Sequence, residues 1–281
     1  MLSADKRTPI EDAATVILLR EAPSGRGVET FLLKRHAESG FMGSFHVFPG
    51  GRVDPGDRDL SLPFTGRKVD PLPALLSEPQ SPSDAIFGLF VAGIRETLEE
   101  AGVFLGEARS PSAIDEALRE GAGFREALER SEARLRLDRL IPYARWITPP
   151  VEKRRFDTRF FFARCDRDES QRACHDGFET IDGAWYAPEE ALDRADKLEM
   201  MLAPPTLRTL EELAEAPSVD EAIALGARRP LPLIRPGVAQ VGESFVLTLP
   251  GDPLHPEKTR ALPGPTRLRW DKGRWIGEDP S

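Results

Sequence analysis

The sequence has few cysteines, and this scarcity excludes two classes of protein. Its 281 residues include only Cys165 and Cys174, too few for a disulfide framework and not spaced as paired metal ligands. His175 adjoins Cys174, but two ligands do not make a zinc site. We therefore expect two ordinary thiols.

Long apolar runs and an excess of basic residues are also missing. No run of 18 apolar residues occurs, so no membrane-spanning helix is predicted, and the N-terminus lacks a signal-peptide pattern. The formal net charge is −9, whereas nucleic-acid binders are usually basic. The final residues, 279–281, do not resemble a Ser-Lys-Leu peroxisomal signal. We expect a cytoplasmic protein that binds neither membrane nor nucleic acid.

What is present is a mixture of strand and helix patterns. Apolar runs at 13–19 and 30–35 flank a Gly/Pro-rich turn and predict a hairpin, and further strands are expected at 45–48, 140–149, 154–163 and 183–186. Helical periodicity is found at 85–101, 112–118, 123–137, 204–214 and 218–225, with another helix starting at Pro188. Ser83-Asp84 is a candidate cap for the first of these helices. Beyond 227 the chain is proline-rich, with strand patterns at 245–249, 266–270 and 274–276.

Residues 95–103 (RETLEEAGV) carry the most informative pattern. Glu96, Glu99 and Glu100 fall at i, i+3 and i+4, which places them on one face of a helix. Ile94, Leu98 and Ala101 form the opposite, apolar side. Like charges at this spacing repel one another, and a divalent cation such as Mg²⁺ would neutralise them. The alternative is a solvated acidic helix surface.

Together with an upstream glycine pair, this motif resembles the Nudix box, G-x5-E-x7-R-E-U-x-E-E-x-G-U, in which U is a bulky aliphatic residue. Phe48-Pro49-Gly50-Gly51 resembles the glycine-rich entry to the box, and Asp57 stands where the family has Glu. Thr97 replaces the usual aliphatic residue.

The spacing from Gly51 to Arg95 is about 30 residues longer than in that pattern. This is similar to the Nudix branch with a long insertion inside the box, to which the mammalian peroxisomal coenzyme A diphosphatase belongs. The segment RRFDTRFF, 154–161, also resembles that branch, and 183–192 resembles the family's strand with Trp followed by a helix.

The resemblance implies an α+β fold, namely a Nudix-type α/β/α sandwich around a mixed β-sheet. We expect a Nudix domain at 10–226 with an insertion at 58–82, which is either a floppy loop or a lid or partner surface. Residues 227–281 would form a small C-terminal β appendage. It would pack on the domain or on a neighbouring subunit, so a homodimer is one of the assemblies that the sequence allows.

The resemblance also implies the site. Glu96, Glu99 and Glu100 would bind Mg²⁺ or Mn²⁺, with a backbone carbonyl from Gly51. Arg95 would be structural, pairing with a neighbouring carboxylate such as Asp57. The catalytic residues would be Glu99, Glu100 and Glu179, with Glu179 as the candidate general base and Asp176 as its rival.

Substrate contacts are predicted from arginines that suit phosphate groups. Arg35, Arg154 and Arg155 are the candidates, whereas Arg159 is expected in a structural ion pair. Phe41, Phe45 and Phe156 offer either a stacking face or core packing, and His46 is expected to be structural.

The implied function is metal-dependent hydrolysis of the diphosphate linkage in a nucleoside diphosphate joined to another moiety. Coenzyme A or acyl-coenzyme A leads, although Leu32-Leu33-Lys34-Arg35 matches only part of a coenzyme A signature. Nucleotide sugars and dinucleotides are alternatives, as is a Nudix module that senses a nucleotide without cleaving it.

Overall fold

The computed structural model describes residues 9–23, 25, 27–38, 43–177 and 179–280. Its largest sheet has nine strands: β1 (Ile10–Glu21), β2 (Val28–Arg35), β3 (Phe45–Val47), β4 (Gly50–Arg52), β8 (Ile141–Ile147), β9 (Arg155–Arg164), β10 (Thr180–Tyr186), β11 (Met201–Leu202) and β12 (Leu233–Ile234). The order is β11-β3-β2-β1-β9-β8-β12, with β4 paired to β1 and β10 to β2. The sheet is mixed because β1 runs antiparallel to β2 and parallel to β9.

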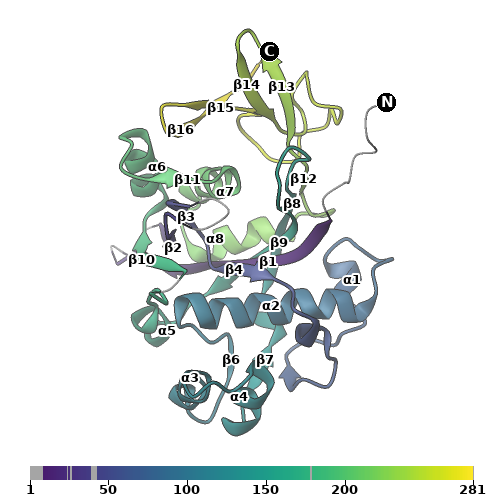
Figure 1. Ribbon diagram of the computed structural model, residues 1–281, viewed down its shortest axis with the longest axis vertical. Helices are drawn as coiled ribbons and strands as arrows, with labels where there is room; N and C mark the ends of the chain where they lie inside the picture. Colours follow the sequence, from purple (N-terminus) through teal and green to yellow (C-terminus); the bar gives the residue numbers. More distant parts are fainter. Residues whose placement is uncertain (1–8, 24, 26, 39–42, 178, 281) are drawn as a thin grey trace.

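Strand β1 is apolar on both faces, which requires cover on both. Val16 and Leu18 belong to one core cluster, whereas Ile17 and Leu19 belong to the other, as expected from side chains that alternate across a strand. Helix α2 (Ser83–Ala101) covers the first face, and α6 (Pro188–Asp196), α7 (Pro204–Ala214) and α8 (Val219–Ala224) cover the second (Figure 1). The predicted α/β/α sandwich is confirmed.

Helix α2 contains the acidic motif and forms for local reasons. Leu98 is only 4% exposed and lies in the core with Ile94 and Ala101. The hydroxyl of Thr97 donates to the Gly93 carbonyl at 2.7 Å, which satisfies a polar group at a buried position. The helix ends at Gly102, whose φ of +66° is left-handed, as glycine allows. The predicted Ser83-Asp84 cap is wrong, because the N-cap residue is Pro82 and no side chain caps the helix.

The insertion at 58–82 is packed into the domain and is therefore not a floppy loop. It follows the 3-10 helix η1 (Pro55–Arg58), contains β5 (Phe64–Thr65) and the short helix α1 (Leu72–Leu75), and buries Leu62, Leu72 and Leu76. Strand β5 belongs to a small sheet of order β5-β7-β6, with β6 (Gly106–Glu107) and β7 (Arg134–Arg136). Near its end, buried Glu78 forms ion pairs with Arg145 and Arg159.

The segment between α2 and β8 differs from expectation in one helix. Helices α3 (Pro111–Arg119) and α4 (Phe124–Arg130) form, but the helix predicted at 123–137 ends at Arg130. Glu132 has a φ of +51°, which ends helical geometry, and residues 134–136 then pair as β7 before the 3-10 helix η2 (Leu137–Arg139). Helix α5 (Arg167–Arg172) was not predicted, although Asp166 and Glu169 form its capping box.

The C-terminal residues form a separate antiparallel sheet at one end of the molecule (Figure 1). Its strands are β13 (Gly237–Val241), β14 (Ser244–Thr248), β15 (Arg267–Asp271) and β16 (Arg274–Glu278), preceded by the 3-10 helix η3 (Leu225–Ala227). Leu268 is fully buried in the same core cluster as Leu207 and Leu210 of α7. The appendage is confirmed, and it packs on the rest of its own chain.

Two smaller expectations are also settled. Both cysteines are free thiols, Cys165 buried and Cys174 exposed. Within the described ranges, the helices are too short or too polar to cross a membrane.

Candidate active site

Two glycines bring the backbone of β4 against the acidic helix. Gly50 and Gly51 pair with Thr15 and Ala14 of β1. A Cβ on Gly51 would lie 2.3 Å from Oε1 of Glu96 and would displace this carboxylate, and a Cβ on Gly50 would lie 2.4 Å from the Ala14 carbonyl oxygen. The glycine pair therefore permits the Glu96 carboxylate to lie directly on the strand backbone.

The three glutamates of the motif have different environments. Oε2 of Glu100 accepts a hydrogen bond from the Gly50 N–H at 2.8 Å, and Glu100 is only 6% exposed. Glu96 is half-buried and accepts from Nη1 of Arg95 at 2.8 Å. Glu99 accepts from the same nitrogen at 2.9 Å, but it is exposed.

Arg95 organises this cluster. Its Nε and Nη2 donate to the two oxygens of buried Asp57 at 3.0 Å each, and Nη2 also donates to the Arg52 carbonyl. Such a two-point contact fixes the guanidinium plane. The predicted structural role of Arg95, shared with Asp57, is confirmed.

Burial raises the pKa of both inner glutamates. For Glu100 the pKa rises to about 8, chiefly through desolvation, while the Gly50 N–H opposes the shift and negative Glu96 and Glu179 add to it. For Glu96 desolvation raises the pKa to about 7 against the opposing charge of Arg95. Two buried carboxylates that lack sufficient positive charge are a donor set that suits a hard divalent cation.

The side chains as they stand do not form a complete metal site. In the described part of the chain, no three His, Cys, Asp or Glu side chains converge to hold one ion. Arg95 engages both Glu96 and Glu99, so joint ligation by the three glutamates would require these two carboxylates to leave it. The residues fit a divalent cation by their chemistry, with that rearrangement.

A cavity of about 1220 Å³ opens beside this cluster. Its floor is the sheet face that α7 covers: Ala13 and Thr15 of β1 lie opposite Thr158 and Phe160 of β9, and all four line the cavity. Six of the predicted site residues line it as well: Arg35, Gly51, Glu96, Glu100, Arg154 and Glu179. No described residue of the insertion 58–82 does, so the insertion is not a lid over this cavity.

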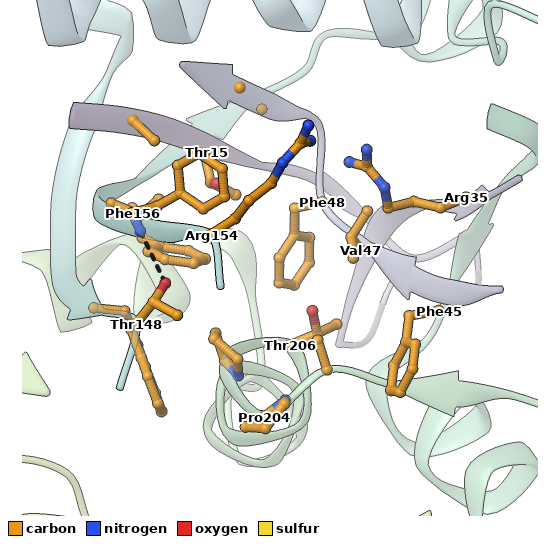
Figure 2. A pocket seen from close by; sticks show the side chains of 18 of the residues that line it. Thr15, Arg35, Phe45, Val47, Phe48, Thr148, Arg154, Phe156, Pro204 and Thr206 are labelled. Carbon is orange, nitrogen blue, oxygen red and sulfur yellow. Dashed lines mark hydrogen bonds between the residues drawn. The ribbon is translucent and has the colours of Figure 1, made fainter. Parts of the chain in front are cut away.

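Two of the three predicted phosphate ligands, Arg35 and Arg154, approach the cavity from different parts of the sheet. Arg35 lies at the end of β2 and Arg154 directly before β9. Figure 2 shows both guanidinium groups turned toward the same side of the cavity, with Phe48 below them. A diphosphate between them would meet positive charge from two sides.

Alternation along β9 separates the neighbouring arginines. Arg154 and Phe156 line the cavity, whereas Arg155 donates from Nε to the Thr148 carbonyl at 3.1 Å and does not line it. Arg159 is buried and pairs with Glu78 at 2.6 Å, so its expected structural role is confirmed. The prediction that Arg155 contacts substrate gains no support, and Glu99 also lies outside the cavity lining.

The two candidate bases are placed differently. The carboxylate of Glu179 is exposed at the cavity, 3.7 Å from Arg35. Asp176 accepts hydrogen bonds from the N–H and the hydroxyl of Thr180 at 3.0 and 2.8 Å, which fixes the loop before β10. The arrangement favours Glu179 over Asp176.

Several lining residues were not predicted. Phe45 and Phe156, weighed as stacking or core residues, both line the cavity, while Phe41 falls outside the described residues. Trp146, Thr148, Pro204 and Trp275 line it without having been proposed. The period-2 pattern of β8 could have placed Trp146 and Thr148 on one face, but no local signal could have placed Trp275.

Comparison with known proteins agrees with this geometry. The family model described as NUDT19 Nudix domain matches residues 10–213. The acyl-coenzyme A diphosphatase NUDT19 of Gallus gallus is 29% identical over 302 residues, covering 88% of this chain and 80% of the relative. That of Homo sapiens is 28% identical over 291 residues, covering 85% and 76%.

A solved structure supports the fold. The crystal structure of a Nudix hydrolase from Alicyclobacillus acidocaldarius is 26% identical and superposes with a TM-score of 0.60, covering 77% of this chain and 96% of that one. Members of this family hydrolyse diphosphate linkages of nucleoside diphosphate derivatives and generally use divalent metal ions. The chain therefore belongs to the Nudix hydrolase family, as a diphosphate hydrolase with a NUDT19-type Nudix domain.

Proposed function

We propose that this enzyme hydrolyses the diphosphate of coenzyme A and of its acyl thioesters. The observation that carries the proposal is the cavity itself, because two inward-turned arginines and the box carboxylates share it with a broad apolar surface. A substrate with a charged diphosphate and a long, less polar arm matches both parts. The relatives named acyl-coenzyme A diphosphatase support the same substrate class.

Glu96, Glu99 and Glu100 are the proposed cation ligands, together with the Gly51 backbone carbonyl, once Glu96 and Glu99 leave Arg95. The proposed ion is Mg²⁺ or Mn²⁺, since both are hard cations that prefer oxygen ligands. When bound, such an ion neutralises phosphate charge and polarises the linkage that is cleaved.

The remaining roles fall to the chain's own side chains. Arg35 and Arg154 would hold the diphosphate oxygens and orient the linkage. Glu179 would accept the proton of the attacking water, a task for which its exposed carboxylate at the cavity is placed. Arg95 would act indirectly, through its contacts with Asp57 and the Arg52 carbonyl, which hold the strand before η1 on helix α2.

The test is a substrate panel with Mg²⁺, read by mass spectrometry. Coenzyme A and acyl-coenzyme A should each yield two phosphate monoesters, and should do so faster than nucleotide sugars or dinucleotides. Faster cleavage of a nucleotide sugar or dinucleotide would move the proposal to that class. Binding without any cleavage across the panel would favour the nucleotide-sensing alternative.

A further inference from the structure

The C-terminal sheet lies outside the region that the family model matches, yet it forms part of the cavity wall. The match ends at residue 213. Leu247 of β14 and Trp275 of β16 both line the cavity. Two segments distant in the sequence from the Nudix box therefore contact the same space as its glutamates.

This wall is held firmly on the domain. Leu249, Leu262 and Leu268 are buried in one cluster with residues of α7. In addition, the ring of Trp270 in β15 packs on Phe45 with centroids 6.0 Å apart, and Arg274 of β16 pairs with Asp196. Leu247 and Trp275 are thus presented by a sheet that is anchored through β15 and β16.

The cavity lining combines charged side chains with an apolar set. The apolar set includes Trp146, Phe160, Pro204, Pro205, Leu247 and Trp275. Figure 2 shows Arg35 and Arg154 on one side of Phe48 and Pro204 on the other. A ligand with a diphosphate held by Arg35 and Arg154 and with a hydrocarbon arm on the Pro204 side of Phe48, which we call the apolar end, matches this lining.

The size of the cavity points the same way. Ligand pockets usually enclose roughly 300–1,000 Å³, and this one encloses about 1220 Å³. A cavity of this size has room for more than a diphosphate, and its lining includes apolar side chains that a hydrocarbon chain can contact. A hydrocarbon chain gains affinity in such a place for each methylene that it buries.

We propose that the apolar end of the cavity, to which we assign Leu247 and Trp275 from the C-terminal sheet, binds the acyl chain of the thioester substrate. The C-terminal sheet then sets the preference for acylated over free coenzyme A. This inference rests on the proposed function. It assigns a specificity role to residues that the family match does not include.

The test is the dependence of kcat/KM on acyl length, from free coenzyme A through butyryl and octanoyl to dodecanoyl thioesters. In the wild type each further buried methylene should raise kcat/KM by roughly fourfold until the space is filled. In Trp275→Ala the ratio of dodecanoyl to free coenzyme A turnover should fall at least tenfold. Leu247→Ala should lower the same ratio by less, and this variant replaces Trp275→Ala in the test if the tryptophan variant does not fold.

Phe245→Ala is the matched control. Phe245 lies on the same strand as Leu247, is 70% exposed and does not line the cavity, so the chain-length profile should not change. An unchanged ratio in Trp275→Ala, with free and acylated substrates falling together, would overturn the acyl assignment and indicate contact with the nucleotide part.

A second readout separates this inference from the proposed function. Dissociation constants of the same thioesters, measured without metal, should show the same chain-length dependence and the same loss in Trp275→Ala. If no coenzyme A derivative is cleaved, the proposed function fails, and these constants still decide whether the apolar end takes an acyl chain. Equal affinity for all chain lengths would refute it.

Discussion

Two charge clusters in this protein are balanced in opposite ways. Where the insertion meets β1, β8 and β9, Asp12, Glu78 and Asp157 pair with Arg58, Arg145 and Arg159, three carboxylates with three guanidinium groups. At the box, Asp57, Glu96 and Glu99 share the single guanidinium of Arg95, while Glu100 accepts its hydrogen bond from a backbone N–H.

The difference in charge balance indicates a structural role for the first cluster and a cation-binding role for the second. A balanced cluster stabilises a joint, here between the insertion and the sheet. In the unbalanced cluster, desolvation raises the pKa of Glu96 and Glu100, and holding these carboxylates there costs stability. A divalent cation that binds between them would offset this cost. Four experiments would break or sharpen this contrast.

The largest effect is expected from Glu100→Gln. The amide keeps the size of the side chain and can still accept the Gly50 N–H, but it removes the negative charge. We expect kcat/KM to fall at least about 100-fold, with the thermal unfolding midpoint nearly unchanged. Glu99→Gln, at an exposed residue outside the cavity lining, should lose less. Comparable losses in the two variants would contradict the distinction between them.

Arg95→Met should cost the most stability. It leaves buried Asp57 without its two-point partner, and breaking a buried pair from one side costs about 3–5 kcal/mol. Urea denaturation measures the loss. The double variant Arg95→Met/Asp57→Leu should recover part of it, because no unpaired charge remains. A loss below about 1 kcal/mol in the single variant would show that the Arg95–Asp57 pair contributes little to the free energy of unfolding.

Glu78→Gln tests the balanced cluster. Arg145 and Arg159 keep Asp157 as a partner, so we expect a loss of about 1–3 kcal/mol and faster proteolysis within 58–82. Turnover should stay at the wild-type level, since the insertion does not line the cavity. A large loss of kcat with stability intact would assign the insertion a part in catalysis.

The smallest effect concerns His46, which is buried as expected for a structural histidine. Burial lowers its pKa to about 4, helped by nearby positive Lys34. The folded state therefore holds fewer protons than the unfolded state between about pH 4 and 6.5, so stability falls as the pH drops through that window. From pH 7 to 5 the wild type should lose about 1–2 kcal/mol more than His46→Gln. An equal loss in both proteins would show that His46 does not contribute.

Local patterns predicted the box and its helix, because spacing, apolar periodicity and the terminal Gly102 all lie within one segment. The glycine pair was predictable from sequence as well, because the lack of a side chain at Gly51 is what allows the close approach of the backbone. Whether Arg154 or Arg155 lines the cavity depends on where β9 begins, since side chains alternate between the two faces of the sheet. Local sequence could not supply the exact start of the strand.

Features that depend on distant partners were beyond the sequence. Residues 134–136 leave their predicted helix because they pair with β5 and β6. The insertion is ordered by Glu78 and its arginine partners on β8 and β9. Trp275 reaches the cavity only because Leu268 and its neighbours dock the C-terminal sheet on α7.

The central claim is that the unbalanced carboxylates at the box bind a divalent cation, and Mn²⁺ titration calorimetry tests it most directly. Wild type and Glu78→Gln should bind Mn²⁺ alike, whereas Glu100→Gln should bind at least about tenfold more weakly. Equal affinity in wild type and Glu100→Gln would contradict the account.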